Sequence, residues 1–301
     1  MKKIKYIIKK LNLSLISFKK IGKSFIINTD KGKFVIKKNT YIDKEILFDY
    51  LESRGFSFYL RPIYSDSNYE VYPYIKQSKI DRIEKYYDLV RIISYLHLKT
   101  TYYRTININK VKEKYKDIED NISSLEKYFY GVEDSILEKE IMSPSEYLLI
   151  RNIFLFYQDL RECRKYLKEW YEIILSKKKE RVVTLHNNLK ADHLLVGNNT
   201  YLIDFEKTFS GSPIYDLYNL FLNSYKCCDF ESLFNLYLEK YPLDKEELLY
   251  LYILLLLPEK IPLEKDELLE CQVIRERLIK MDKVRTFILN NRSKQEKKES
   301  P

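Results

Sequence analysis

Residues 15–38 show the pattern of hydrophobic and polar side chains expected of β-strands. The segments SFIINT and KFVIKK flank DKG, a short turn sequence that predicts a hairpin. Residues 43–53, DKEILFDYLES, instead space their apolar side chains as in a helix, and Gly55 marks its end. Two more extended segments follow, FYLRPIY and YEVYPYI. The pattern therefore predicts a small β-rich lobe with one helix.

From about residue 80 the hydrophobic period becomes that of amphipathic helices. The first of these is DRIEKYYDLVRIISYLHLKT. Two short strands with a loop between them are predicted over 182–204. The last ten or so residues, which include RSKQEKKESP, are charged and poor in apolar side chains, which predicts a disordered tail over 291–301. The other predicted helices cover 108–130, 144–177, 214–225, 229–240, 244–257 and 265–290.

The composition agrees with a folded, helix-rich protein and restricts its partners. The chain has 301 residues, of which 45% are hydrophobic, and contains only six Gly. Its net charge is +9, but acidic residues are interspersed among the basic ones, as in KEKYKDIED. This mixture indicates a solvated surface and no specific nucleic-acid partner. The excess of positive charge still favours an anionic ligand such as a nucleotide.

The chain shows no pattern of a disulfide framework, a signal peptide or a membrane span. Its four cysteines have neither metal-binding nor disulfide-framework spacing, so reduced thiols in a cytoplasmic protein are expected. The N-terminal MKKIKYIIKKLN has too short an apolar core for a signal peptide. The most apolar run, 248–257, is about half of the roughly 20 residues that a membrane span needs. Asp244 and Glu247 precede it at capping-box spacing, which predicts a core helix.

The candidate chemistry lies in RVVTLHNNLKADHLLVGNNTYLIDFEKT, residues 181–208. A β-branched run leads to His186, a polar loop follows, and after a tight turn an apolar strand ends at Asp204. A carboxylate at the end of such a strand can reach a metal ion that bridges phosphates. An Asp that caps a turn is the alternative interpretation.

With the β-rich lobe before it, this segment resembles the protein-kinase-like superfamily, and within it the aminoglycoside and choline phosphotransferase branch. That branch has a His-x-Asp-x-x-x-x-Asn loop, an Ile-Asp-aromatic-Glu/Asp strand and a Pro-x-x-Asp-Leu helix start. The corresponding residues here are HNNLKADH at 186–193, IDFE at 203–206 and PIYDL at 213–217. The segment 236–260, LYLEKYPLDKEELLYLYILLLLPEK, is similar to the spore-coat (CotS-type) branch of the superfamily.

This resemblance implies an α+β, two-lobed fold and a nucleotide cofactor. The small antiparallel lobe would cover 1–75 and the mostly helical lobe 76–290, with the catalytic-type loop at 184–206. VYPYI, at 71–75, would contact an adenine through its backbone. The implied cofactor is ATP with Mg²⁺ or Mn²⁺, bound weakly or not at all in view of the departures described below.

The resemblance also implies roles for individual side chains. Lys37 would contact phosphates, with Glu45 as its partner on the following helix. Asp204 would bind metal, with Glu206 as an accessory ligand, although an exposed Glu is the alternative for Glu206. His186 and Asp216 would support the loop.

Two residues depart from the pattern of the branch. Asn188 replaces the carboxylate that accepts the substrate proton, and a carboxamide can orient a hydroxyl but cannot take its proton. His193 replaces the metal-binding Asn, and imidazole is a poor ligand for Mg²⁺ but acceptable to Mn²⁺ or Zn²⁺. Asp192, one residue earlier, is a candidate substitute for the missing base.

The sequence therefore predicts a catalytically impaired, pseudokinase-like protein that acts by binding, with a spore-coat-like role among the options. The alternative is a divergent, active ATP-dependent phosphotransferase of a small-molecule hydroxyl or amine, because phosphoryl transfer depends more on positioning and charge than on a strong base. A nucleic-acid or membrane-surface binder is a third hypothesis, which the interspersed acidic residues disfavour.

Overall fold

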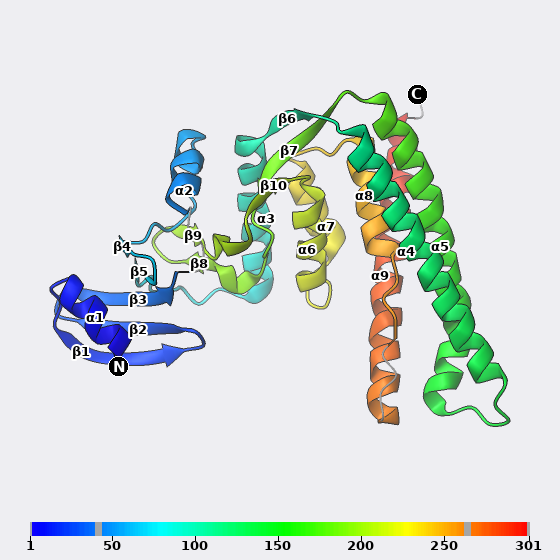
Figure 1. The fold of residues 1–301 in the computed structure, drawn as a ribbon, viewed down its shortest axis with the longest axis horizontal. Coiled ribbons are helices and arrows are strands. Elements are labelled where there is room, and N and C mark those ends of the chain that lie inside the picture. The colour runs from blue at the N-terminus through cyan, green and yellow to red at the C-terminus, as the bar shows by residue number, and fades with distance from the viewer. Residues whose placement is uncertain (1, 40–43, 262–265, 300–301) are drawn as a thin grey trace. The chain divides into compact units, whose positions relative to one another are not determined.

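The computed structural model of the protein describes residues 2–39, 44–261 and 266–299. It has the mixed α+β composition that the sequence predicts, and it divides into two compact units. The first unit consists of Met1–Thr100 and His186–Phe209, and the second of Thr101–Leu185 and Ser210–Pro301. The chain is drawn from blue at its N-terminus to red at its C-terminus in Figure 1.

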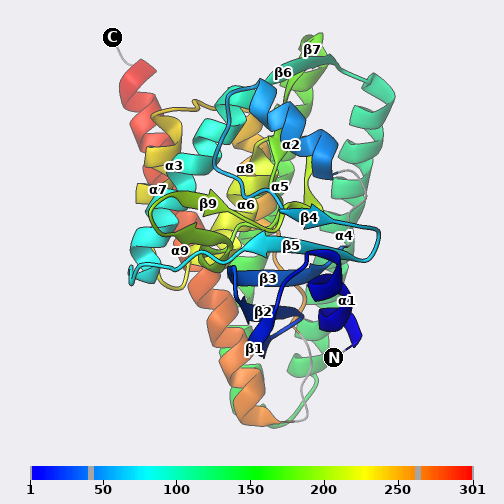
Figure 2. The same cartoon turned by 90° about the vertical axis from the view of Figure 1, so that its left-hand side faces the viewer.

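The first unit is built on a five-stranded antiparallel sheet. Its order is β1-β2-β3-β5-β4, visible as the stack of strands in Figure 2. The predicted hairpin is confirmed, because β2 and β3 pair with Thr29 opposite Gly32, which has φ +120°. The strands are β1 (Leu15–Ile21), β2 (Ser24–Thr29), β3 (Gly32–Lys38), β4 (Tyr64–Ser65) and β5 (Tyr69–Pro73).

One face of this sheet packs on an N-terminal helix that we did not predict. Helix α1 (Lys2–Lys10) places Ile4 and Ile7 against Ile27, Ile36 and Val71 of the sheet, and all five side chains are buried. Burial of these apolar surfaces is the main term that holds the helix on the sheet. The other face of β3 and β5 is thereby left for the candidate site.

The rest of the first unit includes the loop segment, which the sequence had placed in the helical lobe. Helix α2 (Lys44–Ser53) is observed, although residue 43 of the prediction lies outside the described residues. Backbone hydrogen bonds of 2.8 Å, from Ser78 N–H to the Val196 carbonyl and from Leu202 N–H to the Phe58 carbonyl, join the loop to the N-terminal part. The other elements are α3 (Arg82–Thr100), β8 (Leu194–Val196), β9 (Thr200–Leu202) and two 3₁₀ turns, Ala191–His193 and Phe205–Lys207.

The second unit is mostly helical and contains one small sheet. The order of that sheet is β10-β7-β6, and its two outer strands were not predicted. Its elements are β6 (Tyr102–Thr105), α4 (Ile108–Leu137), α5 (Pro144–Ser176), β7 (Lys179–Leu185), β10 (Phe209–Gly211), α6 (Ile214–Ser224), α7 (Phe230–Leu238), α8 (Lys245–Leu256) and α9 (Glu267–Glu299).

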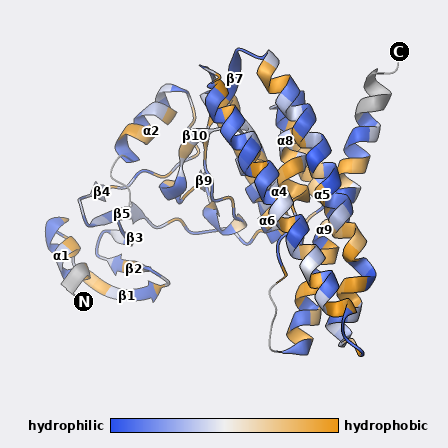
Figure 3. Ribbon diagram, turned by 45° about the vertical axis from the view of Figure 1, so that its right-hand side comes forward, coloured by the Kyte–Doolittle hydropathy of each residue, from blue (hydrophilic) through white to orange (hydrophobic). Residues whose placement is uncertain are grey.

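Helix α5 lies at the centre of the helical unit and contacts α4, α8 and α9. Hydrophobic and hydrophilic residues alternate along α4 and α5 in Figure 3, as expected of helices with one buried face. The capping box of Asp244 and Glu247 is present, and α8 is buried along nearly its whole length, so the predicted core helix is confirmed. Helix α9 continues to Glu299, which carries helical backbone into the segment 291–301 that we expected to be disordered.

Among the helices described, none has the length and apolar character required to span a bilayer. The four cysteines are free thiols.

Candidate functional site

The polar face of β3 and β5 carries the first half of the candidate site. Side chains alternate between the faces of a strand, so burial of Ile36 in the core turns Lys37 to the opposite face. Lys37 is paired across the ladder with Glu70, and Val35 with Tyr72. Because cross-strand partners share a face, these four side chains lie together.

Asp204 comes from the loop segment, where the backbone adopts an unusual conformation. It follows β9 and has φ +66° and ψ +51°, a left-handed geometry that is uncommon for residues other than glycine. The buried His186 donates a hydrogen bond from Nε2 to the carbonyl oxygen of Ile203 at 2.8 Å, and its ring meets Phe205 edge-on. His186 thus fixes the backbone on both sides of Asp204.

Lys37 and Asp204 form an ion pair within the first unit. The ammonium contacts Oδ1 of the carboxylate, and both side chains are about one quarter exposed (24% and 28%). Burial by itself raises the pKa of Asp204, but the hydrogen bond and charge of Lys37 outweigh it, with a smaller contribution from His193. The net pKa of Asp204 is below its usual value. The carboxylate is therefore held in its ionised form.

The partner predicted for Lys37 was Glu45, and this prediction is wrong. Glu45 lies exposed in the first turn of α2, whereas Lys37 pairs with Asp204. A second ion pair, between Lys44 and Glu70 at 2.7 Å, is almost fully buried. Helix α2 therefore contributes the cation, Lys44, and strand β5 contributes the carboxylate, Glu70. Burial and the charge of Glu70 raise the pKa of Tyr72, whose hydroxyl donates to Glu70 at 3.1 Å.

His193 lies beside Asp204 and is oriented by a backbone hydrogen bond. Its Nε2 is 3.3 Å from Oδ2 of Asp204, and its Nδ1 is 2.7 Å from the carbonyl oxygen of Asn188. A carbonyl only accepts, so Nδ1 carries the proton. Nε2 is therefore the ring nitrogen that faces the carboxylate of Asp204.

This pair of side chains fits a divalent cation as part of its coordination. Two ligands that each bind one ion at about 2.1 Å, at right or tetrahedral angles, lie about 3.0–3.4 Å apart, which includes the observed separation. Proton donation from Nδ1 to a carbonyl is also the usual support of a histidine ligand. No group of three or more His, Cys, Asp or Glu side chains suited to a metal occurs in the described part of the chain. Any ion held here would need further oxygens from a ligand or water.

The remaining predicted site residues lie as follows. Asn188 is partly buried in the loop, and its backbone carbonyl is the acceptor for His193. The side chains of Asp192 and Glu206 are both exposed, and Glu206 lines the same cavity as Lys37. Asp216 is buried in the first turn of α6, in the second unit.

A cavity of about 350 Å³ lies within the first unit, and Lys37 and Asp204 are among the residues that line it. This volume is in the range of small-molecule sites. Ile26 and Val35 of the sheet contribute to its wall, as do Leu195 and Leu202 of the β8–β9 hairpin. Residues 73–75, in the segment predicted to contact an adenine, also line it. Most of the lining residues are therefore apolar, and the charged ones are Lys37, Lys44, Asp204 and Glu206.

Three residues of the site, Lys44, Glu70 and Tyr72, were missed from the sequence. A signal was present, because the polar Glu70 and the hydroxyl of Tyr72 alternate with apolar residues in YEVYPYI. That alternation places both side chains on one face of a strand. Their ion-pair partners are set by tertiary structure and have no local signature.

Comparisons with known proteins agree with this arrangement of elements. Residues 151–243 match the model of the phosphotransferase enzyme family. An aminoglycoside phosphotransferase from Alicyclobacillus acidocaldarius has a similar structure, with a TM-score of 0.70 and 14% identity over 94% of this chain and 93% of that chain. Choline kinase LicA from Streptococcus pneumoniae aligns with a TM-score of 0.51 and 16% identity over 97% of this chain and 98% of that chain.

At these identities the structural likeness establishes the fold, so the predicted α+β, protein-kinase-like fold is confirmed. A search of curated proteins found no match to the chain.

Proposed function

We propose that the protein is a kinase-like nucleotide-binding protein with impaired phosphoryl transfer. The observation that carries the proposal is the Lys37–Asp204 ion pair in the lining of a mostly apolar cavity. An apolar slot suits a planar base, and a cation beside a carboxylate suits the phosphates together with their metal ion.

Different residues of the cavity would bind the base, the phosphates and the metal ion of the nucleotide. The apolar side chains of the sheet and of the β8–β9 hairpin would hold the base, and Lys37 would pair with phosphate oxygens. Asp204 and His193 would hold a divalent cation, which supplies charge neutralisation at the phosphates when bound. Because one of these two ligands is an imidazole, we propose that Mn²⁺ is preferred over Mg²⁺.

Impaired catalysis follows from the chemistry of Asn188. The carboxamide at the position of the proton acceptor can orient a hydroxyl but cannot act as a base. Asp192 is a weak substitute, since its side chain is exposed in the 3₁₀ turn that precedes β8. The similarity of 236–260 to the spore-coat branch is a further ground for proposing a role in binding.

The second candidate function is a divergent but active phosphotransferase of a small-molecule hydroxyl or amine. Its support is the intact pairing of Lys37 with Asp204 and the left-handed backbone at Asp204. Backbone strain of this kind is concentrated at functional sites. Turnover by the unmodified protein would favour this second function.

Thermal unfolding in the presence of ATP, ADP or GTP, with Mg²⁺ and then Mn²⁺, tests the proposal. A ligand that binds only the folded state at 100 times its Kd stabilises it by about 2.7 kcal/mol. We expect a rise in Tm with ATP and Mn²⁺ and a smaller rise with Mg²⁺.

Lys37→Met should remove the nucleotide-dependent rise in Tm, because it removes the cation that is paired with Asp204 in the lining of the cavity. Lys38→Met is the matched control, since Lys38 is the adjacent lysine of β3 and its side chain is exposed. An absence of any nucleotide effect on the wild type would contradict the proposal.

A further inference from the structure

The positive charge of the chain is concentrated in residues 1–38. This segment contains twelve lysines and a single acidic residue, Asp30, so its net charge is +11. The whole chain carries +9, so the remaining residues together carry −2. Acidic and basic residues are therefore well mixed in the rest of the chain and not in this segment, which includes α1, β1, β2 and β3.

The exposed lysines of this segment are not neutralised by carboxylates. The single carboxylate, that of Asp30, accepts a hydrogen bond from the backbone N–H of Ser14 at 2.7 Å. In the part of the chain that the structure describes, no carboxylate forms an ion pair with the exposed lysines of α1 and β1, whereas Lys37 pairs with Asp204. These exposed lysines are Lys5, Lys9, Lys10, Lys19 and Lys20.

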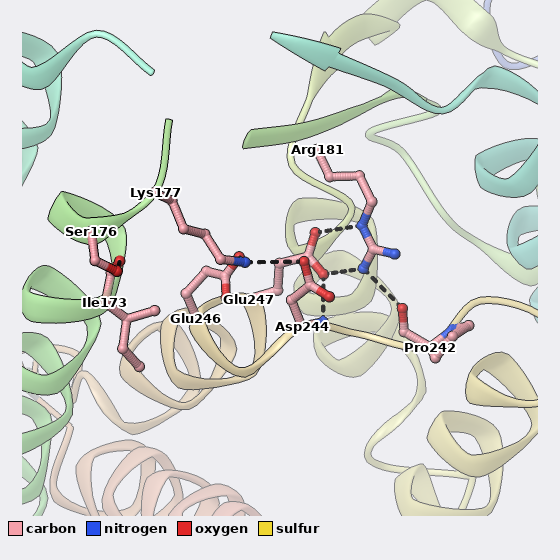
Figure 4. Close-up of polar contacts among 8 residues, drawn as sticks. All are labelled: Ile173, Ser176, Lys177, Arg181, Pro242, Asp244, Glu246 and Glu247. Atoms are coloured by element: carbon pink, nitrogen blue, oxygen red, sulfur yellow. Dashed lines mark hydrogen bonds and ion pairs between the residues drawn. The ribbon is translucent and has the colours of Figure 1, made fainter. Parts of the chain in front are cut away.

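The second unit, by contrast, pairs many of its cations with carboxylates. Figure 4 shows Arg181 pairing with Glu247, and Lys177 reaching Glu246. Ion pairs of this kind leave little net charge to attract an anionic partner. The positive excess of the protein is therefore a property of α1 and of the strands that follow it.

Large apolar side chains are exposed on β1, the edge strand of the five-stranded sheet, whose seven residues are all exposed. Ile16 is 67% exposed and Phe18 is 48% exposed. Phe18 is paired across the ladder with Ile27, which packs against α1, so Phe18 lies on the face of the sheet that α1 covers. Lys20 follows two positions later and shares that face. We call this surface the basic–apolar patch, which consists of Lys5, Lys9, Lys10, Leu15, Ile16, Phe18 and Lys20.

We propose that the basic–apolar patch binds the surface of a membrane that contains anionic lipids. Lysine ammonium groups are attracted to such a surface, and exposed aliphatic and aromatic side chains enter the boundary between headgroups and acyl chains. Residues 1–38 contain no arginine, the residue whose fork geometry suits recognition of individual phosphates. A second copy of the chain is disfavoured as the partner of β1, because Lys19 and Lys20 would face like charges. No residue of the patch lines the proposed nucleotide cavity, so the two functions are tested independently.

Flotation of the full-length protein with lipid vesicles tests the proposal. One set of vesicles contains phosphatidylglycerol and phosphatidylcholine in equal parts, and the other contains phosphatidylcholine alone. We expect binding to the anionic vesicles only, with release as the ionic strength rises, because salt screens exposed charges. Lys9→Gln/Lys20→Gln should weaken binding about 25-fold, since each lysine near an anionic leaflet contributes about fivefold. Ile16→Thr/Phe18→Thr should weaken it at least about tenfold through lost apolar burial, while threonine keeps the strand propensity.

Lys112→Gln/Lys116→Gln is the matched control for charge. Both lysines are exposed on α4, outside the basic–apolar patch, and their replacement removes the same two positive charges. This variant should change the binding by less than about twofold, since charges far from the lipid surface are screened. Thermal unfolding verifies that each variant is folded.

Four results would overturn the proposal. The first is a failure of the wild type to bind the anionic vesicles more tightly than the neutral ones. The second is equal weakening by Lys112→Gln/Lys116→Gln, which would make the effect one of overall charge. The third is binding that Ile16→Thr/Phe18→Thr leaves unchanged and that a DNA duplex abolishes, which would identify a general polyanion site. The fourth is a lipid-free dimer, detected by sedimentation velocity, that Ile16→Thr/Phe18→Thr dissociates, which would identify a second copy of the chain as the partner of β1.

Discussion

Lys37 and Asp204 are 167 positions apart in the sequence and meet as an ion pair in the first unit. One carboxylate oxygen contacts the ammonium of Lys37, and the other lies 3.3 Å from His193. The carboxylate is thus shared between an ammonium and an imidazole. This sharing suits a carboxylate whose partner can be replaced by a metal ion, because the pKa of Asp204 lies below its usual value.

Lys37→Met should raise the pH at which the free energy of unfolding begins to fall on acidification. In the wild type the pKa of Asp204 is lowered, so its ionised form contributes stability above the unfolded pKa, and this is lost as the pH falls through the folded value. Without Lys37, burial remains and raises that pKa. Chemical denaturation between pH 3 and 7 measures the change. An unchanged pH profile would show that the ion pair does not form in solution.

Lys44→Met should destabilise the protein by about 3–5 kcal/mol, because it leaves Glu70 buried without its cation. The double variant Lys44→Met/Glu70→Leu should recover most of that loss, since a buried ion pair and an apolar pair of similar size have comparable stabilities. Urea unfolding of the three proteins measures both effects. Equal loss in the single and double variants would mean that Lys44 contributes packing and not charge compensation.

Gly197→Ala should destabilise the protein by about 1–3 kcal/mol, as overpacking typically does. A Cβ at Gly197 would lie 2.9 Å from the Lys76 carbonyl oxygen and 3.1 Å from Cγ2 of Ile75, so the β8–β9 turn would have to move. Gly131→Ala is the control, because its Cβ enters open space within α4 and should stabilise the helix by about 0.5–1 kcal/mol. Opposite shifts in Tm are expected, and a neutral Gly197→Ala would contradict the close contact.

Asp159 should make the second unit lose stability as the pH rises from about 4 to about 6. Burial raises the pKa of this carboxyl from 3.8 to about 6, despite its ion pair with Arg285 at 2.7 Å. The folded state therefore binds more protons than the unfolded state over that interval, and stability falls with pH. Asp159→Asn should flatten this slope. Glu162→Gln, on the same helix and more exposed, should keep the wild-type slope, and equal slopes in all three proteins would contradict the assignment.

The sequence predicted those features of the fold that depend on local periodicity. The long helices and the β2–β3 hairpin follow from apolar spacing and from the turn sequence DKG. Strand β6 was missed because its residues are all exposed and leave no alternation to detect. Helix α1 had a detectable spacing at Ile4, Ile7 and Ile8, which its many lysines obscured.

The loop residues of the candidate site could be proposed from the sequence, whereas the partners in its ion pairs could not. Asp204 and His193 follow from the order of residues in one segment. By contrast, the partners of Lys37 and Lys44 are chosen by strand register and helix placement, across 167 and 26 positions respectively. The resemblance implied Glu45 as the partner of Lys37, but that residue is exposed on α2 and Lys37 pairs with Asp204.

The double variant Asn188→Asp/His193→Asn should raise phosphotransferase turnover from little or none in the wild type. The change supplies one proton acceptor and one oxygen ligand for metal, in a loop whose backbone His186 already anchors at Ile203. Restoring a base in a positioned site is typically worth about 10²–10⁴-fold in rate. ATP consumption with Mg²⁺, across amino-alcohol and sugar acceptors, measures the gain. Asn187→Asp is the control, because it adds the same carboxylate one residue away and should bring no gain. Robust turnover by the wild type would contradict the impaired-kinase proposal and favour the active phosphotransferase. If all three proteins bind ATP but none shows turnover, the catalytic defect lies outside these two residues.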